Sequence, residues 1–145
     1  MPLSDEVRIY GVMSYDVDTI WPEVTPFLER AIETACGRFS LESTKKAIEA
    51  QREQLWVGYD SDGLCVCFVT TIIDYPCKRS LLIKFLGGRR YEAWIEFIDL
   101  LRGFAREHKC SLMEIYGRPG WEKILKRFRY EKEAVSLVLN LDALT

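Results

Sequence analysis

The sequence has only one histidine and no two cysteines in the C-x2-C spacing, although five cysteines occur among its 145 residues. Structural zinc sites usually draw ligands from loops with that spacing, and a nucleophilic cysteine needs an activating base beside it. His108 lies near the end of a predicted helix, where a solvated helix-end role suffices. The odd cysteine count has no disulfide pattern, so we expect reduced, metal-free thiols in a reducing compartment. Cys65 and Cys67 alternate within one strand-like run and are expected to share one face.

A long uncharged run is also missing. The longest stretch, Gly63 to Tyr75 apart from Asp74, is too short for a transmembrane helix, and neither an Arg-rich leader nor an apolar signal core is present at the N-terminus. With 48% hydrophobic and 29% charged residues, the composition excludes a disordered chain, a coiled-coil rod and a collagen-like fibre. We expect one domain over residues 1–145, in the cytoplasm, neither secreted nor bound to a membrane.

Charge of one sign is barely in excess, because the formal net charge is -2. Its distribution is uneven: residues 1–72 hold 6 Lys+Arg against 12 Asp+Glu, whereas residues 73–145 hold 14 against 10. Such asymmetry is typical of two surfaces with different partners, and it also arises when charges simply follow the solvated helix faces. The sequence pI of about 5.5 argues against nucleic acid as the main partner.

What is present is a strong alternation of apolar periods, which predicts ten elements in the order β-α-α-β-β-β-α-β-α-β. The predicted strands are 7–13, 55–59, 64–75, 80–86, 111–116 and 134–141. Helical spacing follows Thr19 up to Gly37, opens again at Ser40 or Ser43, spans 90–109 and covers 121–128. The long helix would join its two neighbouring strands in parallel. The expected fold class is α/β, three layers with a mixed central sheet of about six strands flanked by helices.

This element order resembles the GNAT superfamily of N-acetyltransferases over essentially the whole chain. The most specific local likeness is the passage 117–130, which runs from Gly-Arg-Pro-Gly-Trp into the last helix and ends at Arg129-Tyr130, in place of the Gly-Phe that closes many GNAT domains. More narrowly, the adjacent glycines and this passage resemble small acetyltransferase-like proteins encoded by tailed bacteriophages. The resemblance implies a GNAT-like fold.

In that family, small residues after the fourth strand let backbone N–H groups approach the pyrophosphate of acetyl-CoA at a helix N-terminus. The matching positions are Gly87, Gly88, Arg89 and Arg90. They do not reproduce the family's R/Q-x-x-G-x-G/A loop, because bulky side chains follow the two glycines, although the arginines can hold phosphate by charge. We therefore expect no cofactor, with acetyl-CoA as the alternative.

The family's catalytic positions are replaced as well. Counting back from Tyr130, its Asn position falls on Arg118, and the position of the Tyr that protonates the departing thiolate falls on Leu125. Substitute candidates are Glu114 as a general base and Tyr116 or Tyr130 as phenols. Each has a structural alternative, as a solvent-facing strand residue or a packing aromatic.

A basic stretch from 118 to 132 offers a candidate protein-contacting surface. Its anchors are Arg118, Trp121, Lys126 and Arg127, since Arg and Trp are frequent at interfaces; a solvated helix face and a core Trp121 are the alternatives. Two functions remain open. The first is a GNAT-like domain without catalysis that contacts other proteins as a structural component, for example in a phage virion. The second is an acetyl-CoA-dependent N-acetyltransferase acting on a small-molecule or protein amine. The replaced motif positions favour the first.

Overall fold

The computed structural model describes residues 6–90, 95–117 and 120–144. Five strands form one sheet in the order β1-β2-β3-β4-β5. The strands are β1 Arg8–Val12, β2 Glu53–Asp60, β3 Gly63–Asp74, β4 Arg79–Gly88 and β5 Leu112–Ile115. The helices are α1 Val17–Glu33, α2 Leu41–Glu49, α4 Leu101–Glu107 and α5 Gly120–Lys126. The 3-10 turns are η1 Ser14–Asp16, η2 Ile95–Leu100 and η3 Leu141–Leu144.

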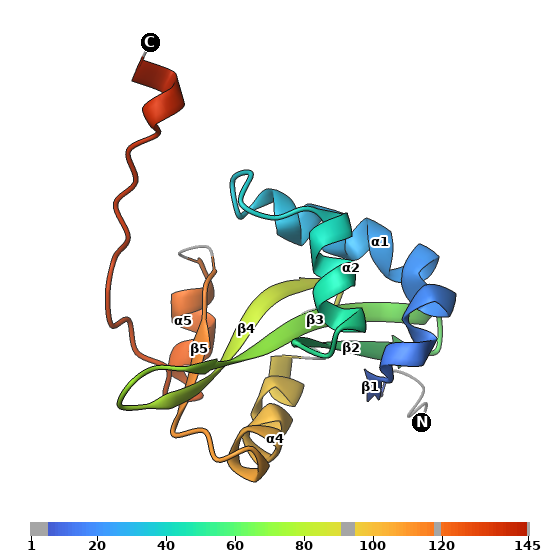
Figure 1. The fold of residues 1–145 in the computed structure, drawn as a ribbon. Helices are drawn as coiled ribbons and strands as arrows, with labels where there is room; N and C mark the ends of the chain where they lie inside the picture. The colour runs from blue at the N-terminus through green and yellow to red at the C-terminus, as the bar shows by residue number, and fades with distance from the viewer. Residues whose placement is uncertain (1–5, 91–94, 118–119, 145) are drawn as a thin grey trace.

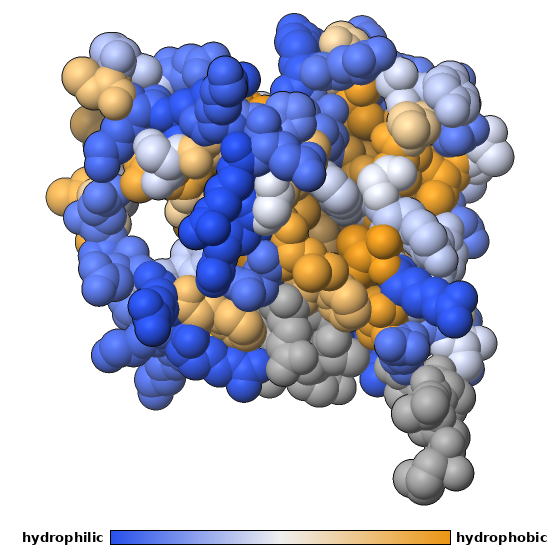
Figure 2. Space-filling view, turned by 90° about the horizontal axis from the view of Figure 1, so that it is seen from below, coloured by the Kyte–Doolittle hydropathy of each residue, from blue (hydrophilic) through white to orange (hydrophobic). Residues whose placement is uncertain are grey.

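Helices cover both faces of the sheet (Figure 1). α1 and α2 pack over one face, where Val24, Leu28 and Phe85 are buried together, and α4 and α5 lie against the other face around Phe68 and Leu125. Seen from the α4 side, apolar side chains gather in the middle of the surface and hydrophilic ones surround them (Figure 2). This arrangement confirms the expected α/β class with three layers.

Strand directions also agree with the sequence-based expectation. β1 through β4 are antiparallel neighbours, and β4 pairs with β5 in parallel. Parallel neighbours need a crossover connection, and the segment between β4 and β5 supplies it. The carboxyl ends of β4 and β5 therefore lie at the same edge of the molecule.

The single long helix predicted over 90–109 is shorter in the structure. Residues 91–94 lie outside the described residues, η2 covers 95–100, and only α4 is α-helical. Its buried positions, Ile98, Leu101 and Ala105, are spaced by three and four residues, a pattern that 3-10 and α turns both satisfy. His108 follows α4 as its exposed C-cap, as expected. Among the described helices, none is long and apolar enough to cross a membrane.

The sixth predicted strand, 134–141, is not formed. Residues 130–140 have no regular structure and run along the outside of the molecule (Figure 1). A strand exists only where a neighbouring strand accepts its backbone hydrogen bonds, and the described chain places none beside this segment. The sheet accordingly has five strands rather than about six.

A β-bulge separates the two central cysteines. Gly58 pairs with Val66 and Tyr59 with Leu64, which leaves Cys65 as the extra residue. Cys65 is buried on the α4 side and Cys67 beneath α1, so the expectation that they share a face is wrong, because a bulge shifts the alternation by one. All five thiols are free in the structure, and burial raises the pKa of Cys67 to about 12. Their reduced, metal-free state stays a prediction.

Candidate active site

β4 and β5 separate at a second bulge. Their parallel pairing ends at Ile83 and Ile115, and the register of β4 against β3 shifts beyond Thr70, which leaves Lys84 as the extra residue. A bulge bends its strand and increases the local twist. β4 then continues to Gly88 without β5 beside it, so backbone groups on that side have no strand partner in the described chain.

A cleft of about 500 Å³ lies where the two strands part. Its walls are residues 84–88 of β4, residues 115–117 after β5, the carboxyl-terminal half of α1 and the first turn of α5. Arg30 and Lys84 are the charged side chains of the wall, and no carboxylate belongs to the lining that the structure describes. The other lining residues are mostly apolar or glycine. The cleft therefore suits an extended ligand that carries negative charge.

α1 forms its wall of the cleft by unusually close contact with β4. A Cβ atom on Gly87 would lie 2.6 Å from the carbonyl oxygen of Phe27, a separation that real side chains do not adopt. Gly87 and Gly88 both line the cleft. The paired glycines singled out in the sequence thus lie at the cleft, and Gly87 lets the helix backbone approach the strand.

The bulge residue Lys84 is held by a buried ion pair. Its Nζ lies 2.6 Å from Oε2 of Glu53 on β2, and the two side chains are only 15% and 8% exposed. The ammonium group also lies over the ring of Phe39, 3.8 Å from the ring centre. The Lys84 charge is thereby balanced inside the protein, which leaves Arg30 as the exposed cation of the cleft wall. Sequence reasoning missed both Arg30 and Lys84, because neither belongs to a motif.

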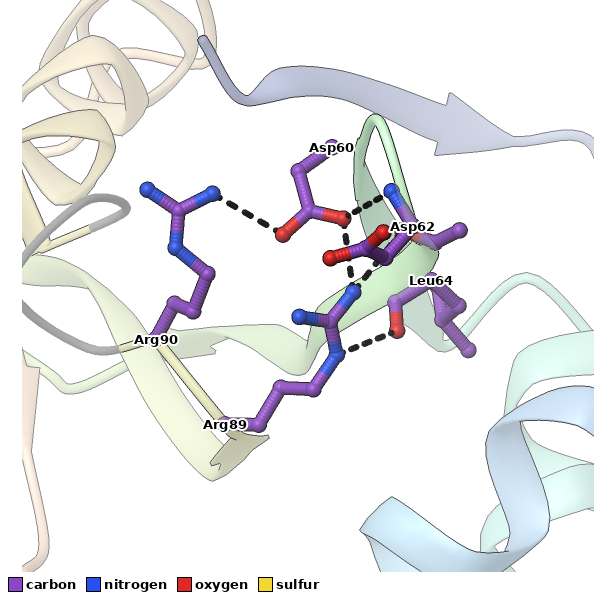
Figure 3. A network of polar contacts seen from close by, with 6 residues as sticks. Asp60, Asp62, Leu64, Arg89 and Arg90 are labelled. Atoms are coloured by element: carbon purple, nitrogen blue, oxygen red, sulfur yellow. Dashed lines mark hydrogen bonds and ion pairs between the residues drawn. The ribbon is translucent and has the colours of Figure 1, made fainter. Parts of the chain in front are cut away.

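Arg89 and Arg90 are engaged elsewhere, with Asp60 at the turn between β2 and β3 (Figure 3). Asp60 accepts a 2.6 Å hydrogen bond from Arg89 and one of 2.9 Å from Arg90, and it also accepts the backbone N–H of Asp62 at 2.8 Å. The Asp60 side chain is 1% exposed. Hydrogen bonds from the two guanidinium groups hold the pKa of this carboxyl far below its ordinary value. Neither arginine lines the cleft, so the structure does not bring them to the place where the sequence expectation put a phosphate.

Replacing Asp60 should have a pH-dependent cost. Because its pKa is lower in the folded state, the carboxylate stabilises the fold above its ordinary pKa of 3.8 and loses this effect as the pH falls below that value. Asp60→Asn is expected to lower the thermal midpoint at pH 7, and the gap to the unmodified protein should narrow as the pH falls below about 4. Asp62→Asn, at an exposed neighbour, is the control. An equal gap at pH 3 and pH 7 in thermal melts would contradict the assignment.

The three catalytic candidates occupy different places. Tyr116 is 69% exposed and lines the cleft. Glu114 lies on β5 outside the lining and accepts a hydrogen bond from Tyr75 at 3.0 Å. Tyr130 packs against the α4-side core, and burial raises its pKa to about 12. Leu125, at the family's Tyr position, is buried in that core.

The candidate interaction surface is divided as well. Trp121 is half-buried, packs against the core and lines the cleft. Lys126 and Arg127 are exposed, while Arg118 lies outside the described residues. A protein-contacting role for these residues stays a prediction.

No family model and no curated protein matches the chain in sequence. Solved structures match its fold. One is described as a predicted acetyltransferase with acetyl-CoA from Clostridium acetobutylicum (TM-score 0.70, 11% identity, 94% of this chain and 97% of that one). A second is a ribosomal-protein-alanine N-acetyltransferase from Brucella melitensis biovar Abortus 2308 (0.67, 14%, 93% and 99%). A third is glucosamine-6-phosphate N-acetyltransferase from Arabidopsis thaliana (0.65, 11%, 95% and 100%).

The fold defined by these neighbours and by the sheet topology is a GNAT-like α/β fold. The expectation of no cofactor is corrected by them, since a neighbour solved with acetyl-CoA points to that cofactor. The neighbours also favour the acetyltransferase alternative over a domain without catalysis, and nothing among them links the chain to a bacteriophage.

Proposed function

We propose that this protein is an acetyl-CoA-dependent N-acetyltransferase. The observation that carries the proposal is the cleft between the diverging carboxyl ends of β4 and β5, in a fold shared with proteins described as N-acetyltransferases. Acetyl-CoA supplies an acetyl group activated as a thioester. The acceptor is a primary amine, on a small molecule or a protein.

The chain's own groups provide the binding contacts. Beyond Ile83, the open side of β4 offers unpaired backbone N–H and C=O groups, which suit a ligand with amide groups in an extended arm. Gly87 and Gly88 leave that backbone accessible because no side chain projects from them. Arg30 is exposed at the wall and forms no ion pair with other described residues, so its guanidinium is available for a phosphate.

The reaction needs one proton donor at the cleft. The amine nitrogen attacks the thioester carbonyl carbon, the C–N bond forms and the C–S bond breaks. The amine's proton passes to water, since the described lining contains no carboxylate, and the departing thiolate takes a proton from a general acid. Tyr116 is the phenol of the lining, and we assign it this role in place of the buried Leu125.

Thermal melts with and without millimolar acetyl-CoA test the proposal. A ligand present at 100 times its Kd stabilises the folded state by about 2.7 kcal/mol, which is a measurable shift. Arg30→Ala should weaken acetyl-CoA binding about tenfold, the effect of removing one charged hydrogen bond. Arg106→Ala, an exposed position on α4 at the opposite face, should leave binding unchanged.

Absence of any thermal shift and of any calorimetric heat with acetyl-CoA would refute the proposal. Where binding occurs, Tyr116→Phe separates the two roles of the cleft. It should keep the affinity for acetyl-CoA and lower kcat about a hundredfold with any amine that supports turnover. An unchanged kcat would remove Tyr116 from the mechanism and leave the binding site intact.

A further inference from the structure

The segment 134–141, called here the C-terminal segment, exposes more apolar surface than any other part of the described chain. Leu137 is 92% exposed, and Val135, Val138, Leu139 and Leu141 are each 66–71% exposed. An ion pair from Lys132 to Glu122 ties the preceding residues to α5. Beyond that point the segment stands clear of the helices and strands (Figure 1). Water-exposed apolar side chains in this number mark a surface that another surface covers.

The segment has the chemistry of a strand without a neighbour. Val135, Leu137, Leu139 and Leu141 alternate with Ser136 and Asn140, the period-two pattern of a strand with one buried face. None of its residues is charged. Two identical copies of it can therefore lie side by side without bringing like charges together.

The same molecule has an open sheet edge. β5 is the last strand of the sheet and pairs only with β4, and its four residues are all half-buried. At about 3.3 Å per residue, β5 spans about 13 Å, whereas the eight-residue segment spans about 26 Å. Its own β5 edge would thus leave half of the segment uncovered.

We propose that the C-terminal segment joins two copies of this chain. Each copy lays its segment along the β5 edge and the C-terminal segment of the other, so that both edges and both segments are covered in one two-fold arrangement. The chain already leaves its own body in the required way. Arg129 takes a left-handed conformation (φ 69), and Tyr130 stays packed beside Met113 of β5, so the segment projects outward without any repacking of the core. This dimer does not depend on the proposed enzymatic function.

Light scattering on the eluting protein, together with hydrogen exchange, tests the dimer. The full chain should elute with twice the mass of its 16.9 kDa monomer. The double variant L137K/L139K should elute as a monomer with an unchanged far-ultraviolet circular dichroism spectrum, because both side chains are exposed within one copy. Tyr15→Lys, which changes a 79% exposed aromatic residue near the start of α1, is the control and should remain a dimer.

Hydrogen exchange on the unmodified protein keeps the proposal falsifiable if the double variant fails to fold. The amides of 134–141 should be protected in the dimer and lose that protection as dilution yields monomer. Protection in a particle of monomer mass would mean that the segment pairs with its own β5 edge, and unprotected amides in a monomer would mean that it pairs with nothing. Either result overturns the proposal.

Discussion

Gly87→Ala should destabilise the protein by about 2 kcal/mol, the usual cost of forcing a methyl group into a well-packed contact. The added Cβ would lie 2.6 Å from the carbonyl oxygen of Phe27 and 3.1 Å from its carbonyl carbon. These are backbone atoms of α1, so no side-chain rotation relieves the clash and the helix has to move away from β4. Since both residues line the cleft, acetyl-CoA binding should weaken along with stability.

The matched control is Gly103→Ala in α4. No atom lies within 4 Å of a Cβ built there, and alanine is favoured over glycine in a helix by about 0.5–1 kcal/mol. Urea unfolding should therefore show changes of opposite sign for the two glycine variants. A neutral or stabilising Gly87→Ala would mean that α1 does not rest on β4 as closely as the structure places it.

Glu53→Gln should cost about 3 kcal/mol, the lower end of the range for breaking a buried ion pair. The substitution keeps the shape of the side chain and leaves the Lys84 ammonium, 15% exposed, without its balancing charge. Oε1 of Glu53 is buried and has no hydrogen-bond partner among the described residues. The carboxylate therefore depends on Lys84, and the amide of Gln would bury a polar group with even less compensation.

Two further variants isolate the charge effect. Glu53→Gln combined with Lys84→Met should recover most of the lost stability, because an uncharged pair of similar volume removes the unbalanced ion. Glu42→Gln breaks the Glu42–Lys46 pair, whose side chains are 79% and 70% exposed, and should change stability by less than about 0.5 kcal/mol. Denaturant titrations measure all three. A double variant less stable than Glu53→Gln alone would show that Lys84 contributes by packing and not by charge.

Much of the fold could be predicted because local periodicity determines most of its elements. The alternation in β2 and β3 around the Asp60–Gly63 turn, and the 3.6-residue spacing in α1, require no long-range information. The two bulges escaped prediction. At Cys65 and Lys84 the register is decided by pairing with neighbouring strands, so sequence alternation assigned Cys65 to the wrong face.

The site was predicted only in part, for the same reason. Gly87 and Gly88 were found because glycine after a strand is a local signal, and they do line the cleft. Arg89 and Arg90 were assigned to a phosphate, whereas Asp60, about 30 residues earlier in the sequence, holds both guanidinium groups. Arg30 and Tyr116 come from α1 and from the end of β5, and only the divergence of β4 and β5 brings them to one cleft.

By itself, the sequence determined the α/β class, the antiparallel start of the sheet and the parallel crossover to β5, since these follow from the spacing of apolar residues and from turn chemistry. Tertiary structure decided where the strands part, which cations remain at the cleft and which are held by carboxylates, and that residues 134–141 have no strand beside them. The physical reason is that bulges, ion pairs and strand pairing depend on groups distant in the chain, whose proximity no local pattern records.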